Sequence, residues 1–272
     1  MKTILLHLIH IIIAPLYFIA LPQGLWLKKY SLRMPEAKGP RKISFGSQQK
    51  NKMKLLYLGE SPAAGVGIAD IKYAVSAQVA DKLAVTQTVE WQLLAQNGIK
   101  IKELLLKLQQ TETQQPDISI ITLGVNDCTG LTPSGKWQEQ VAGLITELRD
   151  RGSRHIFFTA VPPLQRFPLL PAPLSWIMGH RASILNDGLQ KVCAQNGAEF
   201  IVYIVNDGWY TKEPEPQQHA KRCIYRAIEN RRSVIRCANT GISMLINSKG
   251  EIVEERFLNK YGTIKGTINK NN

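Results

Sequence analysis

The chain has few cysteines, and their spacing excludes several kinds of site. Its 272 residues include four of them, Cys128, Cys193, Cys223 and Cys237. No two form a Cys-x-x-Cys pair, and none shows the paired spacing of a zinc site. Free, buried thiols in a reducing compartment are therefore expected, and neither a metal nor another cofactor is predicted.

Acidic residues are scarce at both ends of the chain, although the formal net charge is +13. Residues 28–54 hold nine Lys or Arg against one acid, Glu36, and residues 210–272 hold 12 against six. Residues 55–209 carry 12 basic and 14 acidic side chains, as an ordinary globular protein does. Aromatic residues are not interleaved with the first basic cluster, so we expect a membrane surface rather than nucleic acid as its partner.

Long apolar runs are also lacking, except at residues 4–21. Eighteen residues are about the minimum needed to cross a bilayer core. Trp26 and Tyr30 follow the run where interfacial aromatic residues would lie. The segment Leu21-Pro22-Gln23-Gly24 is a poor signal-peptidase site, which favours a retained anchor over a cleaved signal peptide. A helix that is buried or lies on the protein surface is the further alternative.

Membrane topology follows from the basic cluster. The positive-inside rule predicts a single-pass inner-membrane protein whose catalytic body is cytoplasmic, with a periplasmic body as the alternative. Residues 1–27 are then the hydrophobic helix. Residues 28–52, which are polar and rich in Pro and Gly, are predicted to form a basic tether.

Beyond the tether, strand-like and helix-like segments alternate. The strand-like segments are 54–58, 89–94, 118–123, 155–160 and 200–205, and the helical segments are 63–84, 101–108, 137–148, 180–195 and 217–232. This alternation predicts an α/β fold, a three-layer α/β/α sandwich with a mostly parallel sheet. Ligands of such sheets bind at the carboxyl ends of the strands.

Three short blocks follow three of these strands, and together they offer the groups for acyl transfer. Ser61 is the candidate nucleophile, while Gly98 allows close backbone approach and Asn126 carries a side-chain NH2. The residue after Ser61 is Pro62, which has no amide hydrogen. The oxyanion hole of an α/β-hydrolase, which uses that amide, is therefore excluded at this serine.

These blocks carry a resemblance to a known family. The segments 58–67, 96–98 and 123–127 resemble the first three blocks of the SGNH (GDSL-like) hydrolases, and similarity extends over about residues 25–190. Glu60 departs from the family, which usually has Asp there. The resemblance implies a flavodoxin-like three-layer fold and metal-free ester hydrolysis by Ser61, with Gly98 and Asn126 in the oxyanion hole.

The same resemblance implies a late Asp-x-x-His block that supplies the base and its orienting acid, but no Asp-x-x-His occurs here. Asp207-Gly208-Trp209-Tyr210 stands at the expected place, and tyrosine, with a pKa of about 10, is a poor base for serine. His219 would serve if residues 211–218 fold back as a loop. Asp207 and His219 are thus the candidates, with a structural or exposed His219 as the alternative. His155 and His180 are less suitable as the base, because they lie at the start of a predicted strand and of a predicted helix, respectively.

The end of the chain resembles a second family. Residues 196–255, including the segment Arg226–Arg232, are similar to the C-terminal part of apolipoprotein N-acyltransferase, of the nitrilase superfamily. That family uses a Glu, a Lys and a Cys that lie upstream of this fragment. The predicted division is therefore a hydrolase-like domain at 53–195 and an acyltransferase-like fragment at 196–272.

Three functions follow from these observations. The first is a membrane-tethered serine esterase or acylhydrolase acting on small-molecule or lipid acyl esters, impaired if no base replaces the missing histidine. The second is a lipid-related N-acyltransferase fragment. The third is a catalytically inactive, membrane-associated fusion protein.

Overall fold

The computed structural model describes residues 14–256, apart from residues 31–33, 47–51, 86, 168, 199, 206–214, 232 and 239–241. Within that range, the side chains of strand β6 and of parts of helix α9 and strand β7 are also outside the description.

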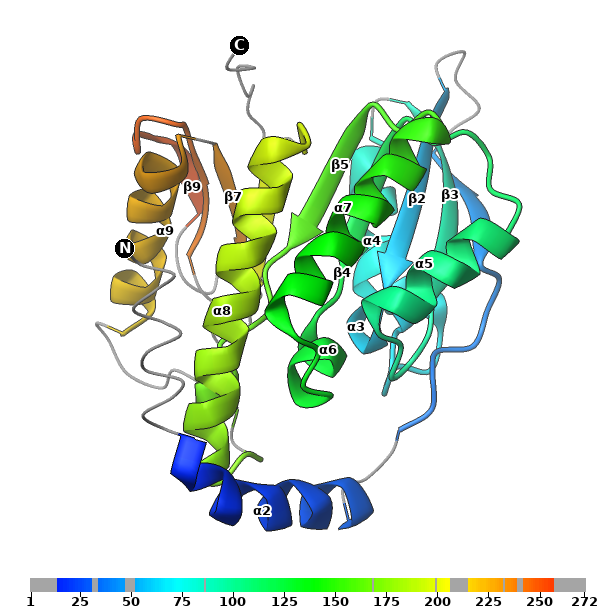
Figure 1. Ribbon diagram of the computed structural model, residues 1–272. Helices are drawn as coiled ribbons and strands as arrows, with labels where there is room; N and C mark the ends of the chain where they lie inside the picture. Colours follow the sequence, from blue (N-terminus) through cyan, green and yellow to red (C-terminus); the bar gives the residue numbers. More distant parts are fainter. Residues whose placement is uncertain are drawn as a thin grey trace.

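One mixed nine-stranded sheet forms the centre of the molecule, in the order β1-β3-β2-β4-β5-β6-β7-β8-β9 (Figure 1). The strands are β1 (Lys42–Phe45), β2 (Lys52–Gly59), β3 (Thr88–Ala95), β4 (Ile118–Thr122), β5 (His155–Thr159), β6 (Phe200–Val205), β7 (Val234–Ala238), β8 (Ser243–Ile246) and β9 (Ile252–Arg256). Six neighbouring strands, β3, β2, β4, β5, β6 and β7, are parallel to one another. Strands β1, β8 and β9 pair antiparallel with their neighbours. The order β3-β2-β4-β5-β6 is the flavodoxin-like one, so the predicted α/β fold is confirmed.

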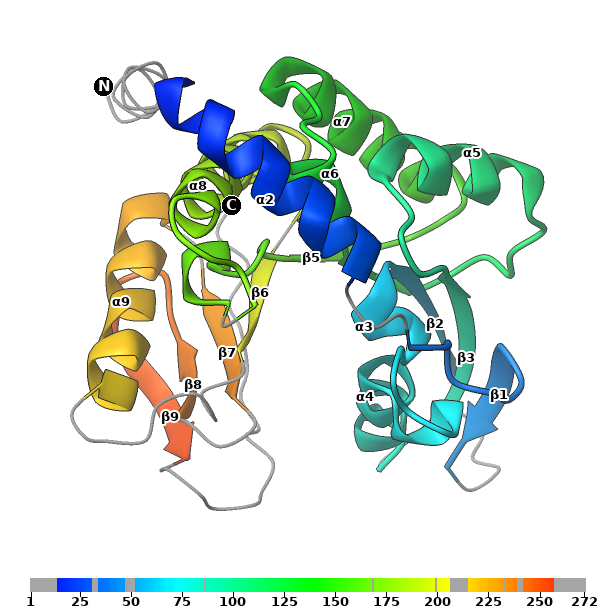
Figure 2. The ribbon, with the colours of Figure 1, turned by 90° about the horizontal axis from the view of Figure 1, so that it is seen from below.

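Helices cover both faces of the sheet. They are α2 (Tyr17–Tyr30), α3 (Ser61–Ala64), α4 (Val75–Leu83), α5 (Ile101–Gln110), α6 (Val125–Thr129), α7 (Ser134–Asp150), α8 (Leu174–Gln195) and α9 (Glu215–Asn230), with 3-10 turns at Ala14–Leu16, Ile71–Tyr73 and Leu164–Arg166. The alternation of side chains along β2 creates the layers. Leu56 and Leu58 join the apolar cluster of α5, α7 and α8, whereas Leu55 and Tyr57 join that of α3 and α4. Figure 2 shows these two groups of helices on opposite sides of the sheet.

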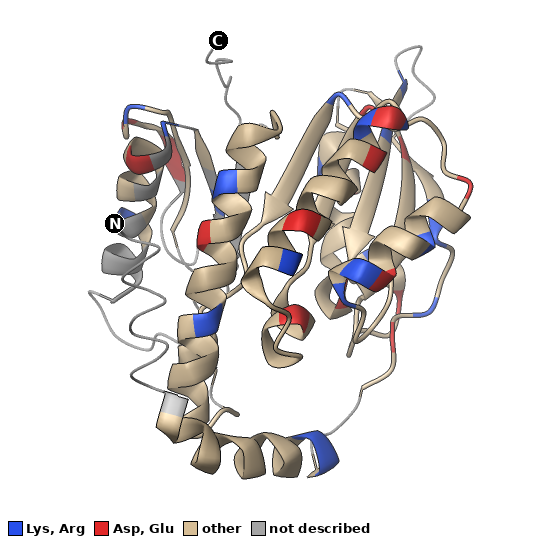
Figure 3. Ribbon diagram, viewed as in Figure 1, with Lys and Arg blue, Asp and Glu red and all other residues tan. Residues whose placement is uncertain are grey.

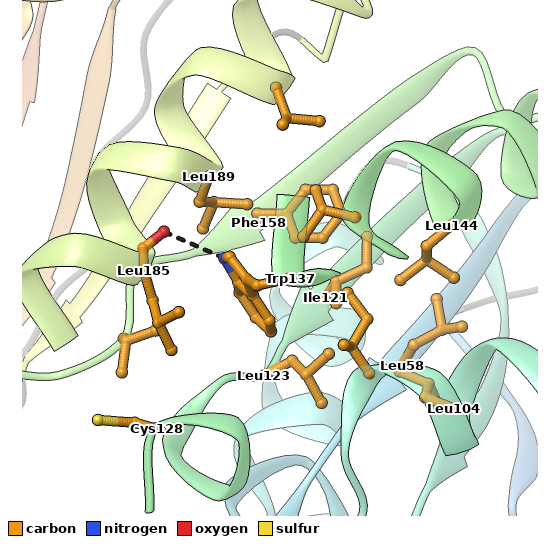
Figure 4. Close-up of a cluster of buried hydrophobic side chains, with 14 of the residues drawn as sticks. Leu58, Leu104, Ile121, Leu123, Cys128, Trp137, Leu144, Phe158, Leu185 and Leu189 are labelled. Atoms are coloured by element: carbon orange, nitrogen blue, oxygen red, sulfur yellow. Dashed lines mark hydrogen bonds between the residues drawn. The ribbon is translucent and has the colours of Figure 1, made fainter. Parts of the chain in front are cut away.

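The larger cluster holds α7 and α8 against the sheet. Trp137 lies at its centre among leucines of the sheet and both helices, and its indole N–H donates to the carbonyl of Leu185, at 3.1 Å (Figure 4). A buried indole needs such an acceptor, because an unpaired N–H in an apolar core would cost free energy. This contact fixes α8 beside α7, and α8 in turn covers β5.

The predicted tether contains a strand. Within residues 28–52, β1 pairs with β3 over four residue pairs, and Phe45 meets the Trp91 ring edge-on, with centroids 6.1 Å apart. Ile43 and Phe45 alternate with exposed residues, a period-2 pattern too short to stand out in a basic, polar stretch. The predicted helix over 63–84 is likewise interrupted, because Gly65 and Gly67 take positive φ between α3 and α4.

The structure describes only part of the predicted N-terminal anchor. Residues 1–13 lie outside the described residues. The 3-10 turn Ala14–Leu16 and the start of α2 carry the remainder of the apolar run, and Lys28 and Lys29 lie in the last turn of α2. No helix in the described part of the chain is long and apolar enough to cross a membrane. Ala20 of α2 is buried in the larger cluster, and Tyr17 and Leu27 pack against it. The described half of the predicted anchor therefore lies on the protein surface.

The sheet continues through the predicted domain junction near residue 195. Strand β6 pairs with β5 in parallel, and β7 with β6. Helix α9 then packs on the β7–β8 end of the sheet through Ala220, Cys223 and Ala227. The tail thus extends the sheet of the preceding segment.

Candidate active site

The three sequence blocks meet at the carboxyl edge of the sheet. Ser61 directly follows β2, Gly98 follows β3 and Asn126 follows β4, which are neighbouring parallel strands. Hydrogen bonds join the blocks. The Ser61 hydroxyl donates to Asn97 Oδ1, at 2.8 Å, and the Asn126 amide donates to Glu60 Oε2, at 3.0 Å. The arrangement predicted for Ser61, Gly98 and Asn126 is present, and their catalytic roles remain predictions.

Two backbone N–H groups are available at this edge. Among the described residues, the amides of Ser61 and Gly98 have no protein acceptor, and Pro62 has no amide hydrogen. Gly98 has a φ of 80°, and a Cβ added there would meet nothing within 4 Å. Its backbone therefore borders open space, as close approach of a substrate requires.

Asn126, the expected third donor, is already occupied. Its side-chain NH2 donates to Glu60 Oε2 and, at 3.2 Å, to the carbonyl of Ile99. An amide NH2 has two hydrogens, so both are used in this arrangement. Asn126 can bind an oxyanion only if one of these two bonds is exchanged for the substrate oxygen.

Glu60 organises the start of α6, which carries Asn126. The side chain is 2% exposed, and it accepts from the amide of Val125, at 2.9 Å, as well as from Asn126. Burial raises the pKa of this carboxyl group to about 7, against the lowering effect of the Val125 and Asn126 amides. Sequence reasoning treated Glu60 only as a departure from the family pattern; its position beside the nucleophile was the available signal.

Asn97 and Glu36 also belong to the site, and sequence reasoning assigned them no role. An amide oxygen such as Asn97 Oδ1 is no base, so this contact orients the Ser61 hydroxyl without activating it. The Asn97 amide donates to Glu36 Oε1, at 2.6 Å, and Glu36 pairs with Arg41. Glu36 is the single acid of the first basic cluster, which was the signal for a specific role.

The base is not identified by the described contacts. Asp207 and Tyr210 lie outside the described residues, and His219 lies near the start of α9 with its side chain outside the description. Helix α9 lies at the β7–β8 end of the sheet, and Figure 2 shows strands β6 and β7 between it and α3. His155 begins β5 and so lies at the amino edge of the sheet, away from Ser61. Asp207 and His219 therefore stay predictions.

Asp127 is close to the site but is held by structural bonds. Its carboxylate accepts from the Ile101 amide, at 3.0 Å, and from the Thr132 hydroxyl, at 2.9 Å. Burial raises its pKa above the ordinary value, while the Ile101 amide opposes that shift. Asp127 thus joins α6 to the start of α5 and to the turn that follows α6.

Thiol and metal chemistry find no support among the described groups. Burial raises the pKa of both Cys128 and Cys193 to about 12, so neither forms a thiolate nucleophile at neutral pH. The described Cys223 is buried as well, as predicted for structural thiols. In the part of the chain that the structure describes, no three His, Cys, Asp or Glu side chains are grouped as metal ligands.

Comparison with known proteins gives the class of this fold and site. The profile of the GDSL-like Lipase/Acylhydrolase family matches residues 57–223, which is more than half of the chain. The chain belongs to that family. Among solved structures, TesA is similar, with a TM-score of 0.45 and 19% identity over 54% of this chain and 76% of that one.

A second similarity concerns the tail. The carbon-nitrogen hydrolase profile matches residues 184–272. The apolipoprotein N-acyltransferase of Geobacter metallireducens is 39% identical over 64 residues, which are 24% of this chain and 12% of that protein. The same enzyme of Allorhizobium ampelinum is 30% identical over 156 residues, which are 54% of this chain and 28% of that protein. The chain thus spans less than a third of these two relatives.

Proposed function

We propose that this protein is an acylhydrolase that cleaves acyl esters through Ser61. One observation carries the proposal: the Ser61 hydroxyl lies beside the Gly98 loop, and the amides of both residues have no protein acceptor within the described residues. Donors without a partner at the carboxyl edge of a parallel sheet suit an oxyanion better than they suit a structural role.

The chemistry then follows from these positions. Ser61 Oγ attacks the acyl carbonyl carbon, its proton passes to a base, and the developing oxyanion accepts from the amides of Ser61 and Gly98. The alcohol leaves with a proton, and water hydrolyses the acyl-Ser61 ester. Asn126 becomes the third donor when its NH2 turns from Ile99 or Glu60 toward the oxyanion.

The test is covalent labelling combined with turnover. The full chain is treated with a fluorophosphonate probe and assayed with a short-chain p-nitrophenyl ester, beside Ser61→Ala. We expect labelling of Ser61 and a fall in kcat of about 10³-fold or more in the variant. The control is Ser44→Ala, an exposed serine on β1, which should leave both readouts unchanged. A variant that hydrolyses the ester as fast as the natural chain would refute the proposal.

The base is assigned by a second pair of variants. We propose His219, oriented by Asp207, and therefore expect His219→Ala to lower kcat with little change in KM. The matched control is His155→Ala, at the opposite edge of the sheet. If His219→Ala matches the control, Ser61 works only with the oxyanion donors, and a residual rate above the Ser61→Ala background remains.

The N-acyltransferase alternative rests on the similarity of the tail. Lipoprotein acylation by the full chain, lost on changing a tail cysteine, would support it. The two cysteines that precede the tail are poor nucleophiles for such an enzyme, since burial raises the pKa of Cys128 and Cys193 to about 12. An inactive fusion protein is the outcome if Ser61 is neither labelled nor required.

A further inference from the structure

Helix α2 presents a broad apolar face to solvent. Phe18 is 85% exposed, Leu25 68% and Trp26 61%. The other exposed apolar residues of this helix are Ile19, Leu21 and Tyr30. A soluble monomer rarely leaves so many large apolar side chains together in water, so this face is expected to be covered by a partner.

The opposite face of α2 is fixed to the protein. Ala20 is buried in the main core and Leu27 packs against it. Gln23 makes two hydrogen bonds with the start of α8, donating to the Ala172 carbonyl, at 2.9 Å, and accepting from the Leu174 amide, at 3.3 Å. Because one face is fixed in this way, α2 cannot be surrounded by lipid, and its free face must meet its partner from one side.

The position of α2 relates it to the site. It lies across the end of the molecule toward which the arrows of β2 and β5 point, the end at which Ser61 lies (Figures 1 and 2). Pro35 and Glu36 lie close to α3 and the site: the Pro35 carbonyl accepts from the Gly67 amide, at 3.0 Å, and Glu36 accepts from the Asn97 amide. A surface that binds α2 therefore faces the edge that carries Ser61.

The charges identify the kind of partner. The last turn of α2 carries Lys28 and Lys29, and the helix has no acidic residue, as Figure 3 shows. In the sequence, the first acid is Glu36, while Lys2, Lys28, Lys29 and Arg33 precede it. Trp26 and Tyr30 stand beside the lysines, with ring centroids 5.4 Å apart. Aromatic residues and lysines that border an apolar face suit the interface of an anionic bilayer.

We infer that α2 is an interfacial helix that binds the surface of an anionic membrane in its plane and sets the Ser61 edge of the sheet against the lipid. This inference rests on the proposed function for its consequence, namely that the acyl esters are lipids taken from the bilayer. The binding itself does not depend on catalysis. In place of the predicted membrane-spanning anchor, α2 lies on the membrane with its apolar face inserted about 5–10 Å.

The test is flotation of the full chain with phosphatidylcholine vesicles that contain or lack phosphatidylglycerol. We expect the natural chain and Ser61→Ala to float equally with the anionic vesicles. The double variant Leu25→Gln, Trp26→Gln should bind about tenfold or more weakly. Lys28→Gln with Lys29→Gln should weaken the preference for anionic lipid. The matched control is Val85→Gln, which changes an equally exposed apolar residue (70%) that precedes the amino end of β3.

Three further readouts decide between the possible occupants and orientations. Brominated lipid should quench the tryptophan fluorescence of the natural chain more than that of Trp26→Phe. Alkaline carbonate should release the protein from the vesicles, whereas it does not release a membrane-spanning helix. Retention in carbonate would overturn the in-plane arrangement. Self-association in sedimentation without vesicle binding would overturn the lipid partner in favour of a second copy of this chain. Vesicle binding without labelling of Ser61 would support the membrane-binding role of α2 and refute the proposed function. Labelling of Ser61 without vesicle binding would support the proposed function and refute the membrane-binding role of α2.

Discussion

Among single residues, Glu60 has the environment that best reveals what the site requires. Its carboxyl group is buried next to the nucleophile and receives the amides of Val125 and Asn126 together with the Asn126 side chain. All three groups are donors, so the ionised carboxylate is the form that fits the geometry. Burial opposes ionisation, and the pKa of about 7 is the balance between these effects.

That balance predicts a pH-dependent contribution to stability. Burial raises the pKa of Glu60 from 4.5 to about 7, so the folded protein binds a proton between these values that the unfolded chain does not. The contribution is fully present below about pH 4.5 and is lost as the pH rises through 7. Between pH 4.5 and 8, the free energy of unfolding of the natural chain should therefore fall relative to Glu60→Gln, by on the order of 2–3 kcal/mol.

Urea unfolding of both proteins at several pH values measures this difference. Other titrating groups are common to the two chains, so they cancel in the comparison. Glu139→Gln, an exposed acid on α7, supplies the baseline for a change of charge. A difference that stays constant from pH 4.5 to 8 would mean that Glu60 has the same pKa in both states.

At the scale of elements, the start of α6 sets where Asn126 lies. Gly124 precedes this helix with a φ of 122°, and a Cβ at this position would lie 2.4 Å from Val161 Cγ2. We expect Gly124→Ala to destabilise the protein by about 2–4 kcal/mol and to lower ester turnover, because Asn126 moves with the helix.

Gly135 is the matched control for this change. It lies in the first turn of α7, and a Cβ there would meet nothing within 4 Å. Gly135→Ala should therefore be neutral or stabilise by up to about 1 kcal/mol through helix propensity. Equal urea midpoints for the two variants would contradict the steric argument.

The elements also show which features of the fold the sequence could predict. Apolar runs and helical periodicity predicted β4, α5, α7, β5, β6 and α9, because these patterns are local to each segment. Strand β1 was missed, since its two half-buried residues, Ile43 and Phe45, stand in a basic stretch that resembles a tether. The docking of α2 depends on Gln23 and the start of α8, about 150 residues away, and no local pattern reports such a contact.

The same distinction applies to the site. Ser61, Gly98 and Asn126 could be placed together, because each follows a parallel strand and the carboxyl ends of such strands share one edge. The links through Asn97, Glu36 and Glu60 could not, because a hydrogen bond depends on side-chain positions that spacing does not fix. Nor could the sequence show that both hydrogens of the Asn126 amide are occupied.

At the scale of the whole molecule, the continuous sheet bears on the predicted division at residue 195. Strand β5 pairs with β4 on one side and with β6 on the other, so residues on both sides of the junction share one sheet. If the tail contributes to one core, then residues 1–196 alone leave β5 as an exposed edge with unpaired backbone groups.

We therefore expect a chain of residues 1–196 to aggregate or to unfold at a lower temperature than the full chain. A chain of residues 1–256 keeps all nine described strands and is the matched control. The full chain should unfold in one calorimetric transition whose calorimetric and van't Hoff enthalpies agree, because the two segments share β5 and β6. Soluble, monomeric residues 1–196 with undiminished ester turnover, or two separate transitions in the full chain, would instead show that the tail folds as an independent appendage. The six parallel strands would then be reduced to four without loss, and the site would depend only on β2, β3 and β4 and the loops that follow them.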